Sequence, residues 1–180
     1  MLRKLNASDV ENFFELESDP EVVRYANPGG KTTAYEEVSD RLLPRLLSYY
    51  AKYDDYGFYA AVEKGTGRFV GWFFLRPVPV DGRLPNSFEE VELGYRLKRD
   101  EWGKGYATEG SRALLEKGFS ELGTKRVVAD VIAENVASIR VLEKVGFKLN
   151  SRFIGEEGDE EVQYALGADE HGRDSDALVE

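Results

Sequence analysis

The residues best suited to chemistry lie in one short segment, Trp102-Gly103-Lys104-Gly105-Tyr106-Ala107-Thr108-Glu109. A strand-like run over 91–97 precedes this segment and a helix-like run over 107–122 follows it, so both glycines fall where the chain turns from strand into helix. The first N–H groups of a helix have no partner within it and carry the positive end of its dipole, and glycines let an anion approach the backbone closely. The segment therefore predicts a binding site for a phosphate group.

The spacing of the glycines excludes one common phosphate-binding loop and disfavours another. A Walker loop requires Gly-Lys-Ser/Thr, but Gly105 is followed by Tyr106. A dinucleotide-binding fingerprint needs a third glycine where Thr108 stands, and an acidic residue that ends the next strand. Asp130 is near the right distance, but 131–133 still continue that strand. A nicotinamide-binding domain is therefore the weakest of the alternatives.

The elements before this segment predict an antiparallel meander accompanied by helices. Three neighbouring strands are expected over 57–63, 68–75 and 89–97. A further short strand is expected over 2–5, followed by a helix with Ser8 or Asp9 as its N-cap. A second helix is expected over 34–53, and Pro44 should kink or split it.

The elements after the segment predict one strand–helix–strand unit and a hairpin. Gly123 should end the helix over 107–122, and the apolar run over 126–133 is typical of a buried parallel strand. Asn135 can cap a short helix that Gly146 ends, and strands over 147–154 and 160–166 should close the fold. The fold class is α/β with a mixed sheet. We expect residues 1–167 to form a single domain and the acidic tail over 168–180 to be disordered.

Composition excludes several classes of function. The 180 residues include 24 Lys and Arg against 34 Asp and Glu, and the net charge of −10 repels nucleic acid and attracts cationic partners. The chain has no cysteine, so disulfides, thiolate metal sites and a cysteine nucleophile are excluded, and no metal site is expected. No segment has the length of apolar sequence that a signal peptide or a membrane helix needs, and a soluble cytoplasmic protein is expected.

Two segments carry a resemblance to a known family. They are Asp100-Glu101-Trp102-Gly103-Lys104-Gly105-Tyr106-Ala107-Thr108-Glu109 and Asn135-Val136-Ala137-Ser138-Ile139-Arg140-Val141-Leu142-Glu143-Lys144-Val145-Gly146-Phe147. The first resembles the Gln/Arg-x-x-Gly-x-Gly/Ala pyrophosphate loop of the GNAT superfamily of acetyl-CoA-dependent N-acyltransferases. Together they are similar to the paired signatures of its RimJ/RimL branch, which acetylates the N-termini of ribosomal proteins. The resemblance implies a GNAT fold, in which the acetyl-CoA-binding unit follows an antiparallel meander and precedes a C-terminal hairpin.

The resemblance also implies which residues bind acetyl-CoA. They are Tyr95, Leu97, Trp102, Gly103, Lys104, Gly105, Tyr106, Ala107, Thr108, Asn135, Ser138 and Lys144. Asn135 is expected either to bind the pantetheine amides or simply to cap its helix. Asp100 stands where the family usually has Gln or Arg, so backbone amides must carry more of the phosphate binding.

Acetyl transfer to an amine requires a base for the bound ammonium and a proton for the departing thiolate. Glu92 is the first candidate base, because the family often places a catalytic glutamate on this strand, although a solvated strand residue is an equal alternative. Ser138 is the candidate acid, and its alternative role is to satisfy N–H groups at the helix start. Leu142 stands where many members have a tyrosine acid.

The leading hypothesis is an N-acetyltransferase whose acceptor is a primary amine attacking the thioester directly. A protein N-terminal α-amine is favoured, with polyamines, aminoglycosides and amino-acid derivatives as alternatives, and the acidic composition suits a cationic acceptor. Acceptor choice is expected to depend on 27–53 and on the loop over 76–88. A rival from another class is a catalytically silent acyl-CoA-binding module. The protein is expected to be a monomer or a homodimer.

Overall fold

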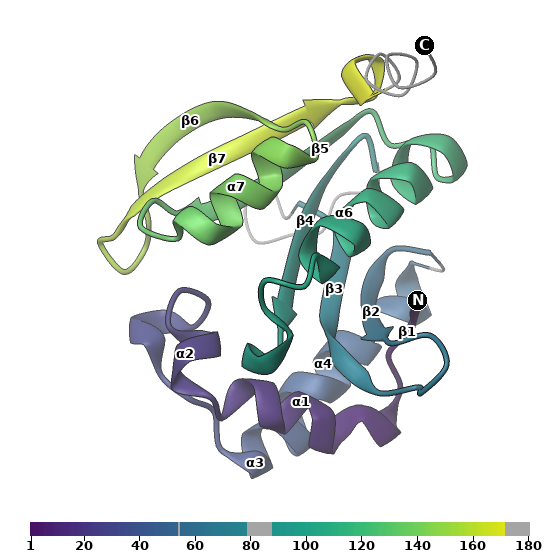
Figure 1. The fold of residues 1–180 in the computed structure, drawn as a ribbon, viewed down its shortest axis with the longest axis vertical. Coiled ribbons are helices and arrows are strands. Elements are labelled where there is room, and N and C mark those ends of the chain that lie inside the picture. Colours follow the sequence, from purple (N-terminus) through teal and green to yellow (C-terminus); the bar gives the residue numbers. More distant parts are fainter. Residues whose placement is uncertain (54, 79–87, 172–180) are drawn as a thin grey trace. The chain divides into compact units, whose positions relative to one another are not determined.

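The computed structural model describes residues 1–53, 55–78 and 88–171, and Figure 1 shows their path. Seven strands of the described residues form one mixed sheet in the order β1-β2-β3-β4-β5-β7-β6. The strands are β1 (Leu2–Lys4), β2 (Gly57–Val62), β3 (Phe69–Pro77), β4 (Glu90–Leu97), β5 (Arg126–Ile132), β6 (Lys148–Ile154) and β7 (Glu160–Gly167). The expected α/β class with a mixed sheet is therefore confirmed.

The helices follow the predicted order. They are α1 (Val10–Glu17), α2 (Pro20–Val23), α3 (Tyr35–Glu37), α4 (Leu43–Leu47), α5 (Tyr49–Lys52), α6 (Tyr106–Glu116) and α7 (Val136–Lys144). The chain falls into two compact units: Met1–Arg76 with Gly94–Gly110, and Pro77–Leu93 with Ser111–Glu180. Both β4 and α6 contribute residues to each unit. The single domain expected over 1–167 stays a prediction.

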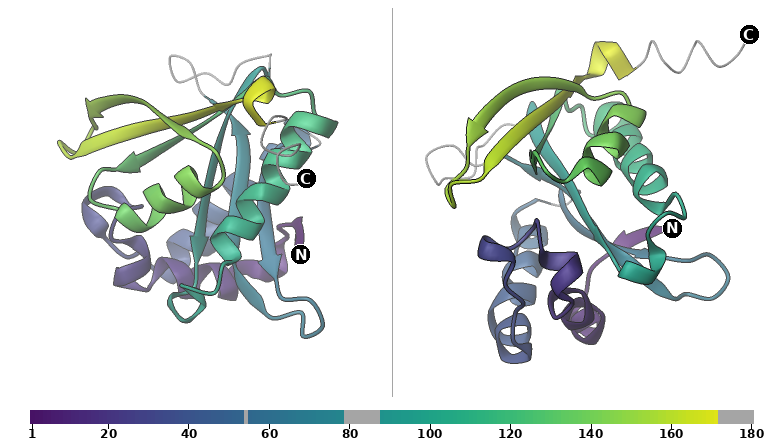
Figure 2. Two further views of the ribbon diagram at one scale, coloured as in Figure 1. Left: turned by 45° about the horizontal axis from the view of Figure 1, so that its top comes forward. Right: turned by 60° about the vertical axis from the view of Figure 1, so that its left-hand side comes forward.

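The first unit places helices against one face of the antiparallel strands β1, β2 and β3, as the right-hand view of Figure 2 shows. Its core is a cluster of buried apolar side chains from both layers: Leu5, Phe13, Leu16, Val38, Leu43, Leu46, Phe58, Ala60, Phe69 and Trp72. The rings of Phe13 and Trp72 stack with centroids 5.4 Å apart. Burial of such large aromatic surfaces explains why this half of the chain is rich in Phe, Tyr and Trp.

The first helical segment begins only partly as predicted. Asp9 stands at the N-cap position of α1, as predicted, but its side chain makes no capping hydrogen bond there. A 3₁₀ turn, Ala7–Asp9, precedes α1 with Asn6 as its N-cap: the Asn6 side chain accepts a hydrogen bond from Ser8 N, and the Asp9 side chain accepts one from Asn6 N at 3.0 Å. Asp9 is buried and forms an ion pair with Arg3 at 2.6 Å. The predicted cap position is therefore confirmed at Asp9, whose side chain instead completes the capping box of the preceding turn and pairs with Arg3.

The segment expected as one helix over 34–53 is split, as predicted. It contains α3, a π-helical turn over Val38–Leu42, α4 and α5. Pro44 lies in the first turn of α4. A proline is tolerated there because its missing N–H would have had no partner within the helix.

The second unit confirms the predicted strand–helix–strand pattern and the hairpin. Strand β4 pairs in parallel with β5 from Glu90 to Glu92, and β7 lies between β5 and β6 with antiparallel pairing on both sides. Helix α7 packs on β5. Gly123 and Gly146 have φ angles of +71° and +98°, which suits the left-handed residues that end helices.

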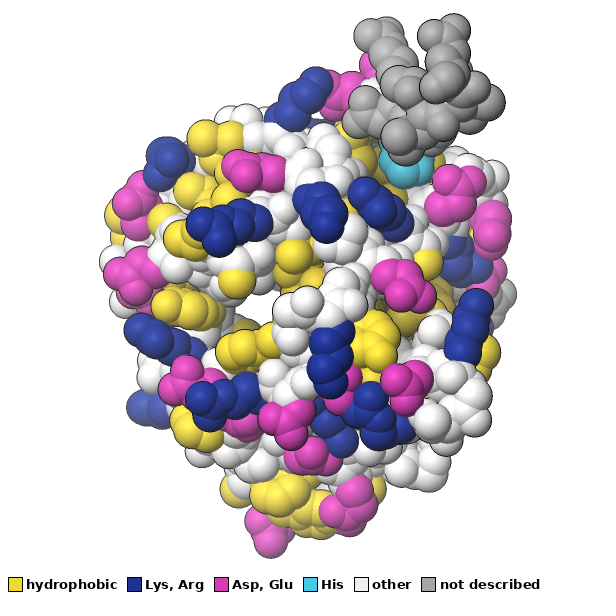
Figure 3. Space-filling model, viewed as in Figure 1, with side chains coloured by type: hydrophobic (Ala, Val, Ile, Leu, Met, Phe, Trp, Pro, Cys, Tyr) yellow, Lys and Arg dark blue, Asp and Glu magenta, His cyan; other side chains and the backbone are white. Residues whose placement is uncertain are grey.

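Two expectations fall partly or wholly outside the described residues. Strand β3 reaches Pro77, and most of the loop predicted over 76–88 lies outside them. Ala168 to His171 form a helical turn at the start of the predicted tail, whereas 172–180 are not described. Among the described helices, none is long and apolar enough to cross a membrane. Figure 3 shows acidic and basic side chains interspersed with hydrophobic ones over the face that it draws.

Candidate functional site

The predicted phosphate loop joins a 3₁₀ turn, Arg99–Glu101, to the start of α6. Gly103 and Gly105 have φ angles of +75° and +88°, and nothing lies within 4 Å of the position that a Cβ would take at either residue. Gly105 directly precedes α6 and has no side chain with which to cap it. Open space above a glycine backbone at an uncapped helix start is what an approaching phosphate requires, so the residues present fit the pyrophosphate group of coenzyme A.

The loop is fixed by hydrogen bonds on its N-terminal side. The indole Nε1 of Trp102 donates to the carbonyl of Leu97 at 3.0 Å, and Lys98 N donates to the carbonyl of Val70 at 3.0 Å. The Trp102 side chain nevertheless leaves 48% of its surface exposed. The loop therefore combines a fixed backbone with an exposed aromatic face.

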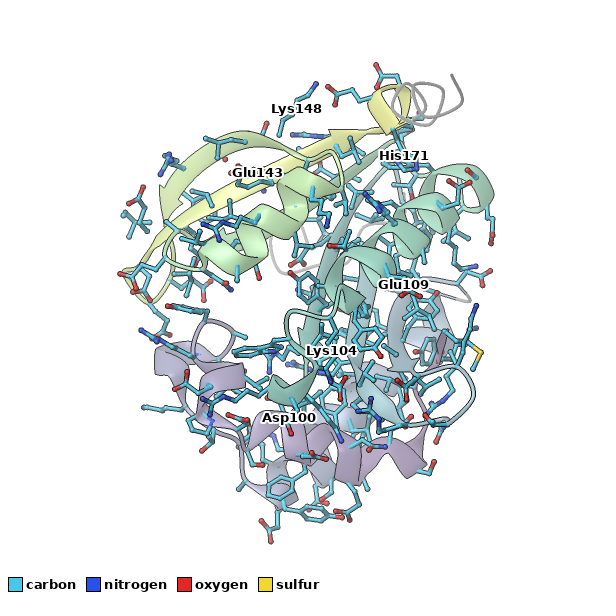
Figure 4. All side chains as sticks on the ribbon, in the orientation of Figure 1. Asp100, Lys104, Glu109, Glu143, Lys148 and His171 are labelled. Carbon is cyan, nitrogen blue, oxygen red and sulfur yellow. The ribbon has the colours of Figure 1, made fainter. Side chains whose placement is uncertain are left out.

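A buried carboxylate lies directly beside the loop. Glu101 is 3% exposed and accepts hydrogen bonds from the guanidinium of Arg68 and from Lys104 Nζ, the latter at 3.2 Å. The Arg68 hydrogen bond holds the pKa of Glu101 below its usual value. Figure 4 shows Lys104 on the loop and Asp100 on the preceding turn. Lys104, one of the residues expected to bind acetyl-CoA, is thus paired with a carboxylate in this structure.

A second carboxylate contacts the first residue of α6. The hydroxyl of Tyr106 donates to Glu63 Oε1 at 3.1 Å. Glu63 and Arg68 flank the turn of the β2–β3 hairpin and pair with each other at 3.4 Å. Sequence reasoning missed Glu63 and Arg68 as neighbours of the loop, because no motif links a hairpin turn to a segment more than thirty residues away.

Four of the predicted site residues lie in the second unit. Asn135 is the N-cap of α7, and its Oδ1 accepts a hydrogen bond from Ser138 N at 3.2 Å. This confirms the capping role, and it leaves the Asn135 NH₂ group as a separate donor. Lys144 is the last residue of α7. Leu142 is 2% exposed and belongs to the core, so it has no chemical role.

Glu92 is the remaining predicted site residue in the second unit. It is half-buried on β4, opposite Val128 of β5. It shares a strand face with Glu90, whose carboxylate pairs with Arg126 at 2.9 Å. Glu90 and Glu92 therefore form a polar face on this strand, and at least one of these two acids is engaged in an ion pair.

Two further predicted residues lie on the part of β4 that belongs to the first unit, together with the loop. The ring of Tyr95 lies 5.4 Å from that of Phe73, and Leu97 is 5% exposed. Trp72 and Phe73 are also buried, so these aromatic residues belong to the core. Leu97 contributes to the loop through its carbonyl, which holds the Trp102 indole.

Comparison with known proteins decides the family. The model of the acetyltransferase (GNAT) domain matches residues 1–148. The chain belongs to the GNAT family. An Aspergillus fumigatus relative, FsC-acetyl coenzyme A-N(2)-transacetylase, is 30% identical over 167 residues, covering 87% of this chain and 68% of the relative. The predicted superfamily is thus confirmed, whereas the RimJ/RimL branch is not.

Solved structures support the same fold. A GNAT-family acetyltransferase from Bacillus anthracis is 25% identical with a TM-score of 0.79, covering 94% of this chain and 95% of that one. The aminoglycoside acetyltransferase AAC(6')-Ib in complex with coenzyme A is 21% identical with a TM-score of 0.77, covering 96% and 97%. This GNAT protein is therefore an acetyl-CoA-dependent N-acetyltransferase with a seven-stranded mixed sheet.

Proposed function

We propose that this GNAT enzyme acetylates a small cationic amine. The observation that carries the proposal is the concentration of acid in residues 9–40, which hold nine acidic and two basic residues. Six of the acids are exposed, namely Glu11, Glu15, Glu21, Glu36, Glu37 and Asp40. Glu15 and Glu37 form ion pairs with Lys98 at 2.6 Å and Arg41 at 3.3 Å. The remaining excess of acid raises the local concentration of cations, so this segment favours a polycationic acceptor.

A thiol-release assay tests the acceptor class. Acetyl-CoA is supplied with a polyamine, an aminoglycoside, a basic N-terminal peptide and a neutral amine, and free thiol is measured. We expect the highest kcat/KM with a small polycation, and a KM for that acceptor that rises with ionic strength. The double variant Glu21→Gln/Glu36→Gln should raise the KM for the cation and leave that for acetyl-CoA unchanged. Equal effects on cationic and neutral amines would contradict the proposal.

The second candidate acceptor is a protein N-terminal α-amine, as in the RimJ/RimL branch. It is favoured by the motif similarity over 103–109 and 135–147. A basic N-terminal peptide that exceeded every small amine in kcat/KM would establish it. Tight binding of coenzyme A with no turnover across the whole panel would instead favour the silent acyl-CoA-binding module.

For the chemical step we propose Glu92 as the general base. Lysine-type amines are protonated at neutral pH, with pKa values of about 10, so removal of a proton from the bound ammonium is needed before attack. Its place on the polar face of β4, beside the Glu90–Arg126 pair, supports this role. In a Glu92→Gln variant we expect kcat to fall and the alkaline limb of the pH profile to change. An unchanged rate and pH profile would exclude Glu92 as the base.

We propose that the hydroxyl of Ser138 supplies the proton to the departing thiolate. Ser138 lies on the first turn of α7, and its backbone N–H donates to Asn135 Oδ1. Buried Leu142 has no proton to give. A Ser138→Ala enzyme should lose turnover with little change in stability, and wild-type turnover in that variant would remove Ser138 from the mechanism.

A further inference from the structure

The carboxylate of Glu101 is a buried charge that the acetyl-transfer chemistry does not use. It precedes Trp102 in the phosphate loop and is 3% exposed. Its partners are Arg68, at the start of the β3 side of the hairpin, and Lys104, which lies between the two glycines of the loop. A buried carboxylate that lost these partners would be strongly unfavourable, so the ion pairs constrain where the loop backbone can lie.

A second contact joins the same hairpin to the other end of the loop. The Tyr106 hydroxyl donates to Glu63 at 3.1 Å, and Glu63 is itself held by Thr66 Oγ1 at 2.8 Å and by Arg68. The two attachment points, Glu101 and Tyr106, lie on either side of Gly103 and Gly105. All of these residues belong to one compact unit.

The charges of this cluster indicate that it orders the loop and does not itself attract phosphate. Arg68 and Lys104 are balanced by Glu63 and Glu101, so the cluster as a whole adds no net positive charge with which to attract phosphate. Two glycines separated by a single residue give the backbone many accessible conformations, and ordering such a loop on binding costs conformational entropy. Contacts that order it beforehand reduce that cost and increase affinity.

We propose that the β2–β3 hairpin is a clamp that holds the phosphate loop in its binding conformation, with Glu101 and Glu63 as positioning residues. The carboxylate of Glu101 fixes the loop before the glycines, and that of Glu63 fixes the first residue of α6 after them. The clamp acts on the phosphate-bearing part of coenzyme A and not on the acetyl group or the amine. This inference rests on the assignment of the pyrophosphate to Gly103 and Gly105, and not on the proposed acceptor.

The test uses the full chain with two changes, Glu101→Gln and Glu63→Leu, neither of which lies at a residue expected to bind acetyl-CoA. Dissociation constants of coenzyme A and of 3′,5′-ADP, which carries phosphates but no pantetheine, are measured by calorimetry. We expect both dissociation constants to rise by about tenfold in each variant. Loss of a residue that orients a binding group without touching the ligand typically has an effect of this size. The kcat at saturating acetyl-CoA should stay within about twofold of wild type, as expected for uniform binding. Glu160→Gln, which removes the exposed Arg152–Glu160 pair, is the matched control and should change neither constant.

Several outcomes would overturn the clamp. Unchanged dissociation constants in both variants would do so, as would a loss of coenzyme A affinity without a loss of 3′,5′-ADP affinity. A fall in kcat and in melting temperature that matches the loss of affinity would show a general structural role instead. Because calorimetry needs no amine, the result does not depend on whether the proposed acceptor is correct.

Discussion

The starts of α6 and α7 have the same backbone pattern but opposite chemistry. In each, the residue before the helix accepts the first intrahelical hydrogen bond: Glu109 N donates to Gly105 at 3.0 Å, and Ile139 N donates to Asn135 at 3.1 Å. At α7 the Asn135 side chain then caps the helix. At α6 the corresponding residue is Gly105, which has no side chain and has open space above it.

The difference supports the proposal that the start of α6, and not that of α7, binds the phosphate. A side-chain cap contributes about 1 kcal/mol to stability, and the start of α6 does without one. The loop before α6 is held instead by the ion pair between Arg68 and Glu101 and by the hydrogen bond from Tyr106 to Glu63. The uncapped helix start can then offer its N–H groups to phosphate without the loop being disordered.

The largest expected effect comes from filling the space above a glycine. Gly105→Val places a branched side chain where we assign the phosphate, and each charge-assisted bond lost costs about 1.5–3 kcal/mol, so affinity for coenzyme A should fall about 10- to 100-fold. Gly123→Val is the matched control, because Gly123 has a similar φ of +71° and similar open space at the end of a helix. The Gly123→Val variant should lose stability but keep its affinity for coenzyme A. Equal losses of affinity in both variants would contradict the assignment of the phosphate to Gly105.

At the start of α7 the expected effect is on stability. Asn135→Ala should lower the free energy of unfolding by about 1 kcal/mol, whereas Asn135→Asp retains a capping oxygen and should be close to wild type. Urea unfolding measures both. If the Asn135 NH₂ group also binds pantetheine, the Asp variant alone will show a raised KM for acetyl-CoA with normal stability. An Ala variant as stable as wild type would show that the cap is unimportant.

The two helix starts should also differ in their dependence on pH. Arg68 lowers the pKa of Glu101, so the stability that this pair contributes is present above the ordinary glutamate pKa of about 4.3 and is lost as the pH falls through the lower folded-state value. The difference in unfolding free energy between wild type and Glu101→Gln should therefore shrink below pH of about 4. The difference for Asn135→Ala should not change in that range, because an amide does not titrate.

The smallest expected effect is optical. The chain has two tryptophans, of which Trp72 is 6% exposed and Trp102 is 48% exposed. Coenzyme A should quench the fluorescence of Trp102, and Trp102→Phe should abolish the signal while changing affinity by about fivefold at most, the value of one hydrogen bond. A quenching signal that persisted in Trp102→Phe would place the cofactor away from the loop.

The sequence predicted the order of elements well because the relevant signals are local. Runs of aromatic and β-branched residues located β2 and β3, alternation located β4, glycines marked the ends of helices, and Pro44 correctly divided the segment over 34–53. The cap predicted at Ser8 or Asp9 shows the limit of a local signal: Asp9 does precede α1, but its side chain is buried against Arg3, and Asn6 caps the turn before the helix. The phosphate loop could be proposed from the sequence because its glycines lie in one short motif, and its binding of phosphate stays a prediction.

The residues that support the loop could not be predicted because they are distant in sequence. Arg68 and Glu101 are separated by 33 positions, and Arg96 pairs with buried Glu17 across 79. Such pairs follow from the register of strands and the packing of helices, which single-residue patterns do not encode. Lys104 is an example. Its position in the motif places it beside the expected phosphate, but in the structure its side chain forms an ion pair with Glu101.

The most direct test of the account is a titration of ¹⁵N-labelled protein with 3′,5′-ADP, followed by the backbone amide signals in NMR spectra. The account predicts that the amides of Gly103 to Ala107 shift strongly and saturate together, whereas those of Val136 to Ser138, at the capped start of α7, change little. Strong shifts at the start of α7 with unmoved glycine signals at 103 and 105 would contradict the assignment of the phosphate to the uncapped helix.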